Sequence, residues 1–350
     1  MQPAAKTSAP LHSEPRHGTR WSERLPATLL IMVIIALGVS GCSYLAVRTA
    51  APKQAVTERS EAAINADALF WKTLHAGRYD EIEPVIRALQ IAYIDTPGDA
   101  ITAAHIGFMR AWQASERARA PAEDPVSTDW IMLARRYFAE AHALQPDEAR
   151  FHGFLASMML AEGQIHADEK LTRRGYFEMR DAIDAWPEFN LFTGGYVLSQ
   201  LAPDTERFKE GLQWQWQTLD ICAGETVSRQ DPDYSRYMAR YQTQGPQRVC
   251  WNSWIAPHNL EGFFMNMGDM LVKSGDWQTA VKIYQNAKKM PDFARWPYRD
   301  MLERRISAAQ DNVSRFNDPT PAANAIDHRI MINSPYACMA CHQATPTVGR

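Results

Sequence analysis

The sequence predicts an all-α protein, and three observations lead to that prediction. Ala, Leu, Met, Glu, Arg and Gln, which favour helices, are abundant, whereas alternating β-branched runs of the kind that strands require are few. Prolines recur where helical patterns end, at Pro97, Pro146, Pro187 and Pro291. Apolar residues make up 46% of the 350 residues, which is ample for a packed core. We therefore expect stacked helical hairpins over residues 55–316.

The first 47 residues are expected to lie outside this helical domain. Residues 1–24 are rich in Pro, Ser, His and Arg and predict a disordered cytoplasmic tail. Residues 25–47 are uncharged and long enough to span a bilayer as a helix. Because arginines gather before this segment, the positive-inside rule leaves the N-terminus in the cytoplasm and exports the rest of the chain.

The end of the apolar segment reads Val39-Ser40-Gly41-Cys42 and resembles the lipobox of bacterial lipoproteins. The resemblance implies that Cys42 is lipidated and becomes the mature N-terminus. An uncleaved membrane helix is the alternative, because the stretch before the apolar run is long for such a signal and the run continues past Cys42. In both cases we expect a protein tethered to the bacterial cell membrane with its bulk in the periplasm.

The clearest internal unit covers residues 264–291, in which large and small residues recur at fixed offsets. The matching residues are Phe264, Met267, Gly268, Leu271, Ala280, Tyr284, Ala287 and Pro291. This unit resembles a tetratricopeptide repeat (TPR), and weaker copies lie upstream. The resemblance implies antiparallel helix pairs, packed closely at Gly268 and Ala280, and a concave groove that binds a protein segment.

Near the C-terminus, Cys338-Met339-Ala340-Cys341-His342 has the CxxCH pattern by which a chain holds a c-type haem. Each thiol can form a thioether with a haem vinyl group, and His342 is placed to ligate the iron. The pattern resembles that of c-type cytochromes, which implies one covalent haem c. We expect it on an irregular tail, residues 326–350, that a linker over residues 317–325 joins to the helices.

Two other interpretations of the cysteine pair fit the sequence less well. A closed zinc site needs four protein ligands, and no second CxxC exists. A thioredoxin-like redox pair is expected beside a βαβ pattern, and the flanks of this motif are rich in proline. The two cysteines left over, Cys222 and Cys250, are expected to form a disulfide in an oxidising compartment, with two buried free thiols as the alternative.

The second iron ligand is open to several candidates. His328 ranks first, because it lies on the tail and can fold back over the haem, and Met331 ranks second. Met339 lies inside the motif and is poorly placed. From the helical domain the candidates are His105, His142, His152 and His258. An open or partner-supplied position is the remaining alternative.

Five tryptophans are candidates either for an aromatic lining beside a haem or interface, or for the core between hairpins. Trp251 and Trp254 are spaced to share a helix face, whereas Trp214 and Trp216 are not. Trp296 is the fifth.

Composition and motifs narrow the function. A net charge of −3 gives no basic field for nucleic acid. No nucleophile motif, phosphate-binding glycine loop or HExxH pair occurs, so an enzyme is less expected than an electron carrier. We expect a membrane-anchored periplasmic monohaem c-type cytochrome, whose partner is a periplasmic or membrane redox protein or complex. The oligomeric state, including a homo-oligomer, is open.

Two alternatives belong to other classes. The first is an assembly or scaffold subunit of a larger redox complex, in which the haem is structural. The second is a haem enzyme or gas sensor with an open iron site, which carbon monoxide binding to the reduced protein would reveal.

Overall fold

The computed structural model describes residues 43–116, 126–319, 329–331 and 338–345. Among these residues every regular element is a helix and no strand occurs, so the all-α prediction is confirmed. The α-helices are α2 (Glu61–Ala76), α3 (Ile82–Asp95), α4 (Ala100–Ser115), α5 (Ser127–Leu144), α6 (Ala149–Ile165), α7 (Glu169–Ala185), α8 (Pro187–Leu198), α9 (Glu206–Ala223), α10 (Asn259–Lys273), α11 (Trp277–Ala287), α12 (Arg299–Ser307), α13 (Ala309–Phe316) and α14 (Cys338–His342). Short 3₁₀ helices occupy Tyr79–Glu81, Ser235–Arg240, Pro246–Cys250 and Phe293–Arg295.

The chain divides into two units, residues 1–52 and 53–350, and residues 43–52 are the described part of the first. Of the predicted membrane segment 25–47, residues 43–47 are described and are helical, whereas Cys42 and the residues before it lie outside the described part. No helix in the described part of the chain has both the length and the apolar character needed to cross a bilayer. The larger unit contains every helix from α2 to α14.

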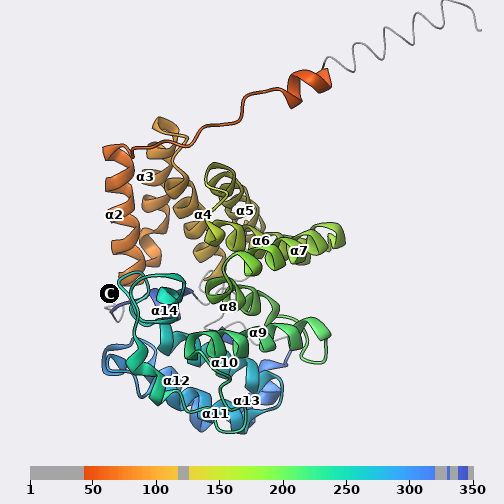
Figure 1. The fold of residues 1–350 in the computed structure, drawn as a ribbon, viewed down its shortest axis with the longest axis vertical. Helices are drawn as coiled ribbons and strands as arrows, with labels where there is room; N and C mark the ends of the chain where they lie inside the picture. Colours follow the sequence, from red (N-terminus) through yellow and green to blue (C-terminus); the bar gives the residue numbers. More distant parts are fainter. Residues whose placement is uncertain (1–42, 117–125, 320–328, 332–337, 346–350) are drawn as a thin grey trace, which may run out of the picture. The chain divides into compact units, whose positions relative to one another are not determined.

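The helices of the larger unit pack as hairpins that follow one another in chain order (Figure 1). The pairs are α2 with α3, α4 with α5, α6 with α7, α8 with α9, and α10 with α11. Contacts of α3 with α4, of α5 with α6 and of α6 with α8 join neighbouring hairpins. The short helix α14 packs against α10 and α2, and so connects the last of these hairpins with the first.

Local chemistry explains where the helices begin and end. Side-chain oxygens at several N-termini accept backbone N–H bonds of the first turn, at Ser60, Asp99, Asp168, Thr205 and Asp276. Three helices, α3, α5 and α7, end two residues before Pro97, Pro146 and Pro187, because a proline disfavours helical geometry at the residue before it. The hairpin boundaries were therefore predictable from these prolines.

The repeat predicted over residues 264–291 is the hairpin of α10 and α11. A Cβ atom at Gly268 would lie 2.2 Å from Cε1 of Tyr284, so the two helices approach closely because residue 268 lacks a side chain. The Tyr284 hydroxyl donates a hydrogen bond to Asp269 at 2.6 Å, and Ala280 is fully buried. The expected close packing at small residues is found in this hairpin.

Candidate haem site

The CxxCH motif forms the short helix α14 within the tail that was expected to be irregular. Cys338 and Cys341 stand three residues apart, so both thiols belong to one helical turn. Both cysteines are free; Cys338 is partly exposed and Cys341 is buried. The motif therefore presents two unpaired thiols directly beside His342.

Two hydrophobic clusters of the helical domain hold α14 in place. Met339 packs into the cluster formed by α2, α3 and α4, and Ala340 packs into the cluster around α10. On α10, a Cβ at Gly262 would lie 2.5 Å from Sγ of Cys341 and 2.7 Å from the carbonyl carbon of Ala340. Any side chain at position 262 would displace the motif, so this glycine makes room for the second cysteine.

The end of α14 is held by hydrogen bonds to its last carbonyl groups. The Trp296 indole Nε1 donates to the Ala340 carbonyl at 2.8 Å, and the His258 backbone N–H donates to the Cys341 carbonyl at 3.0 Å. The last carbonyls of a helix have no partner within the helix, so a buried helix end needs donors from elsewhere. These contacts explain why five residues keep a helical form here.

Gln343, the residue after the motif, is held between the start of α12 and the end of α2. The Tyr298 hydroxyl donates to Oε1 of Gln343 at 2.7 Å. The side chain of Gln343 occupies the space that a Cβ at Gly77 would fill. The Ala344 N–H donates to the carbonyl of His75 at 2.9 Å. The polypeptide is thus anchored on both sides of His342.

The ring of His342 is oriented by a backbone carbonyl. Its Nδ1 lies 2.7 Å from the carbonyl oxygen of Ile255. Because a carbonyl oxygen accepts only, Nδ1 carries the proton and Nε2 keeps its lone pair. Burial lowers the pKa of His342 to about 4, against the opposing effect of the bond to Ile255, so the imidazole is neutral at neutral pH. A neutral ring held in this way is suited to ligate a metal through Nε2.

The electrostatics of the thiols do not fit a redox-active pair. Burial raises the pKa of the Cys338 thiol to about 12, an effect to which nearby Glu116 adds, and burial also raises the pKa of Cys341. Redox-active CxxC pairs depend on a lowered pKa. Across the described ranges no group of three or more His, Cys, Asp or Glu side chains is placed to hold a metal ion.

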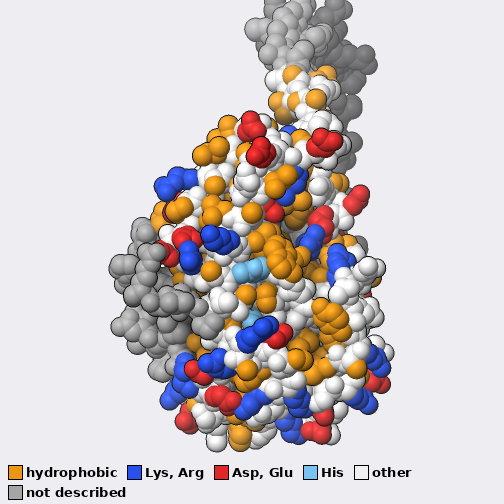
Figure 2. All heavy atoms as spheres, turned by 90° about the vertical axis from the view of Figure 1, so that its left-hand side faces the viewer, with side chains coloured by type: hydrophobic (Ala, Val, Ile, Leu, Met, Phe, Trp, Pro, Cys, Tyr) orange, Lys and Arg blue, Asp and Glu red, His pale blue; other side chains and the backbone are white. Residues whose placement is uncertain are grey.

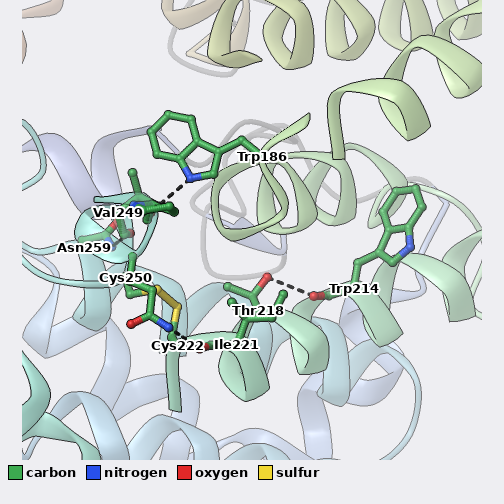
Figure 3. Close-up of a disulfide and its surroundings, with 10 residues drawn as sticks. Trp186, Trp214, Thr218, Ile221, Cys222, Val249, Cys250 and Asn259 are labelled. Carbon is green, nitrogen blue, oxygen red and sulfur yellow. Dashed lines mark hydrogen bonds between the residues drawn. A yellow bond between two sulfur atoms is a disulfide. The ribbon is translucent and has the colours of Figure 1, made fainter. Parts of the chain in front are cut away.

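The carbonyl that holds His342 belongs to the long connection between α9 and α10, residues 224–258. Cys222 and Cys250 lie at disulfide distance, with Cα atoms 5.6 Å apart, which confirms the predicted pair (Figure 3). Side-chain donors fasten the same connection to backbone carbonyls, from Trp186 to Pro246 (3.1 Å), from Gln247 to Ile221 (3.0 Å) and from Asn259 to Val249 (2.8 Å). The disulfide and these bonds hold the loop from which Ile255 reaches the motif.

Of the candidates for the second ligand, His328 lies outside the described residues. Met331 is fully buried, with its sulfur 3.3 Å from the Ser199 hydroxyl and its N–H donating to Asp269 at 2.8 Å. Asp269 lies seven residues along α10 from Gly262, which corresponds to about 10 Å of helix. The sulfur of Met331 is thus engaged away from the turn of α10 that holds the motif.

The other histidines named from the sequence have partners within the helical domain. His105 pairs with Asp67 (2.7 Å), His152 with Glu178 (2.8 Å) and His258 with Glu261 (3.1 Å), and the ring of His142 stacks on that of His152 (4.5 Å). Each of these rings therefore has a partner that lies outside α14.

The prediction that Trp251 and Trp254 share a helix face is wrong, because residues 251–256 do not form a helix. The side chains of Asn252 and Ser253 accept hydrogen bonds from nearby backbone N–H groups, and Pro257 disfavours helix before it. Trp251 is 2% exposed and Trp254 is 66% exposed. The i, i+3 spacing of the two tryptophans indicated a shared helix face only if the segment were helical, and it is not.

Trp254 belongs to a surface aromatic group that the sequence did not reveal. Its ring lies 5.0 Å from that of Trp71 and 5.4 Å from that of His75, and Nε2 of His75 lies 3.4 Å from the same Ile255 carbonyl that holds His342. Figure 2 shows apolar and histidine side chains gathered on this side of the molecule. The spacing of Trp71 and His75 on α2 was a weak signal that many helices share.

The other tryptophans are core residues. Trp214 and Trp216 are buried in separate clusters, as their spacing predicts, and Trp296 is fully buried against α14.

An open hollow of about 490 Å³ lies beside the end of the motif. It is lined by Pro257, His258, Asp292, Arg295, Arg299, Ala344 and Thr345. Neither cysteine lines it, and His342 does not line it either. We therefore do not place a haem there.

No family model, curated protein or solved structure matches the chain. The residues themselves fit a covalently attached haem in three respects. Two free thiols share one helical turn, a neutral histidine keeps Nε2 for a metal, and a glycine makes room for the sulfur of Cys341.

Proposed function

We propose that this protein is a monohaem c-type cytochrome that exchanges electrons with a protein partner. Cys338 and Cys341 hold one haem c through thioether bonds, and His342 ligates its iron through Nε2. The main support is the 2.7 Å contact between Nδ1 of His342 and the Ile255 carbonyl, because it fixes the ring and leaves Nε2 as the ligand. A bound haem supplies reversible one-electron chemistry.

The helical domain provides recognition in this proposal. It is a TPR-like array, and its groove docks a periplasmic or membrane redox protein or complex. The close approach of Gly268 to Tyr284 supports the repeat. The Cys222–Cys250 pair supports an oxidising compartment, in agreement with a membrane anchor over residues 25–47 or a lipid on Cys42, with the bulk in the periplasm.

Attachment is tested by the haem content of protein matured in a periplasm. A pyridine haemochrome assay should show about one covalent haem per chain, and the Cys338→Ala/Cys341→Ala double variant should show none. Met339→Leu, which conserves volume between the two cysteines, is the matched control and should keep its haem. Equal haem content in the wild type and the double variant would refute attachment at the motif.

For the second ligand we propose His328, with Met331 as the alternative. The engagement of Met331 with Ser199 and Asp269 supports this ranking, because a coordinating sulfur would have to leave that site. His328→Ala should convert a low-spin spectrum into one in which the reduced protein binds carbon monoxide, whereas Met331→Leu should not. If the wild type already binds carbon monoxide, the open-site alternative gains and the His328 proposal fails.

A structural haem in a scaffold subunit is the second candidate function. It is favoured by one observation: Met339 and Ala340 pack into different clusters, so α14 joins the first and last hairpins. A redox titration distinguishes an electron carrier from a scaffold subunit. An electron carrier is reduced and reoxidised reversibly without unfolding, whereas a scaffold haem need not be.

A further inference from the structure

A row of aromatic side chains crosses α4, α6 and α8. We call it the aromatic row; its members are Phe108, Phe154, Phe189, Phe192 and Tyr196. Successive ring centroids are 5.8, 5.5, 5.2 and 5.7 Å apart along this order. The last three members share one face of α8, since they are spaced i, i+3 and i+7. At these distances each ring of the row contacts the next.

Both ends of the aromatic row meet the CxxCH motif. At one end, the ring of Phe108 contacts that of His342 edge to face, with centroids 5.6 Å apart. At the other end, Tyr196 lies near Cys341: burial raises the pKa of Tyr196, and the neighbouring thiol adds to the effect. The row thus begins at the iron ligand and ends beside a covalent anchor.

A second contact confirms that the far end of the row lies at the motif. Asn259, whose carbonyl accepts from Sγ of Cys341 at 3.6 Å, lines a small cavity together with Phe192 and Tyr196. This cavity has a volume of about 20 Å³, roughly that of one water molecule. A macrocycle cannot enter this cavity, so it can meet the row only along the partly exposed phenylalanines.

The aromatic row is less buried than the rest of the core. Its four phenylalanines are each partly exposed, whereas its fifth member, Tyr196, is buried and the core phenylalanines Phe138, Phe208 and Phe264 are at most 1% exposed. A contiguous apolar surface left open to water is costly, and covering it is favourable by roughly 25 cal/mol per Å². Something apolar is therefore expected to cover the row.

We propose that one edge and face of the haem macrocycle lie against the aromatic row. This inference rests on the proposed function, and it commits to the haem as occupant because the atoms that attach and ligate it stand at both ends of the row. Helices α4, α6 and α8 then contact the haem, and the helical array as a whole also binds the partner protein. The row excludes water from the macrocycle and so favours the less charged, reduced iron.

The experiment compares Phe154→Leu/Phe189→Leu with the wild type, both carrying haem. Phe177→Leu is the matched control, because Phe177 is 64% exposed on α7. Haem content should stay unchanged, since the thioethers are intact. The row variant should lose Soret circular dichroism, which reports the asymmetric contact of the macrocycle with aromatic rings, and its reduction potential should fall. The control should change neither.

The outcomes are distinguishable from failure of the proposed function. Covalent haem with unchanged Soret dichroism and unchanged potential in the row variant would overturn the inference while leaving attachment intact. Haem retained in the Cys338→Ala/Cys341→Ala variant would overturn the proposed function itself. If the double leucine variant does not fold, judged by far-ultraviolet dichroism, the milder Phe192→Leu variant decides by the same two measurements.

Discussion

Two regions meet at the CxxCH helix, and they are built from different chemistry. One region, which we call the polar contacts, consists of Ile255, His258, Trp296 and Tyr298, each of which makes a hydrogen bond to residues 340–343 at 2.7–3.0 Å. The other is the aromatic row, whose contact with the motif is between rings at 5.6 Å. Hydrogen bonds have strict geometry, whereas apolar contact depends on area.

This difference indicates a division of labour. The polar contacts fix the direction of His342 and the helical form of α14, so in the proposed function they set where the iron ligand points. In our proposal the aromatic row sets how much water reaches the haem. Changes in the polar contacts should therefore alter stability and ligand geometry, and changes in the row should alter the surroundings of the haem with little effect on stability.

The largest expected effect comes from the disulfide, which acts on the polar contacts from a distance. Cys222→Ala/Cys250→Ala frees the connection that carries Ile255, and the chain-entropy model gives a loss of about 3 to 4 kcal/mol for a loop of this length. The free energy of unfolding in denaturant, with and without reductant, measures the effect. Wild-type protein whose stability does not respond to reductant would contradict a structural disulfide.

The disulfide was predictable from the sequence, whereas its consequence was not. Two leftover cysteines in a chain that we expect to be exported suffice to predict a pair, and Pro97, Pro146 and Pro187 suffice to predict where α3, α5 and α7 end. That Ile255 meets His342 depends on an irregular loop whose path is set by Asn252, Ser253 and Pro257, and no periodicity records such a path. Irregular segments are where sequence patterns say least.

The aromatic row could not be predicted from the sequence either. Its members lie on three helices, and on each helix a phenylalanine looks like any other core residue. The row becomes visible only in the folded structure, because its continuity depends on ring contacts between α4 and α6 and between α6 and α8. The residues of the CxxCH motif could be identified from the sequence alone, because they lie within five consecutive positions.

The second-largest effect is expected at Gly262, the glycine that leaves room for Cys341. Gly262→Ala puts a methyl group against Sγ of Cys341, so we expect a loss of about 1 to 3 kcal/mol and a weakened docking of α14. Gly268→Ala is the matched variant on the same helix, because its methyl group meets Tyr284 and not the motif. Both should destabilise, but a changed haem spectrum is expected for Gly262→Ala alone; identical spectra would remove the proposed role of Gly262.

A smaller effect is expected at a single polar contact. Trp296→Phe keeps most of the buried ring and removes the donor to the Ala340 carbonyl, which should cost about 1 kcal/mol. Trp254→Phe serves as control, since Trp254 is 66% exposed and should change stability little. Equal midpoints of chemical unfolding for the two variants would show that the hydrogen bond to α14 contributes nothing.

The smallest effect on stability is expected in the aromatic row. In the haem-free Cys338→Ala/Cys341→Ala background, Phe189→Leu should cost less than about 1 kcal/mol, because Phe189 is partly exposed and leucine retains apolar contact. Phe138→Leu is the comparison, since Phe138 is 1% exposed in the neighbouring core and should lose more. Thermal unfolding of both variants measures the difference. A row variant that is destabilised as strongly as the core variant would mean that the row is ordinary core, and the contrast between the two regions would then fail.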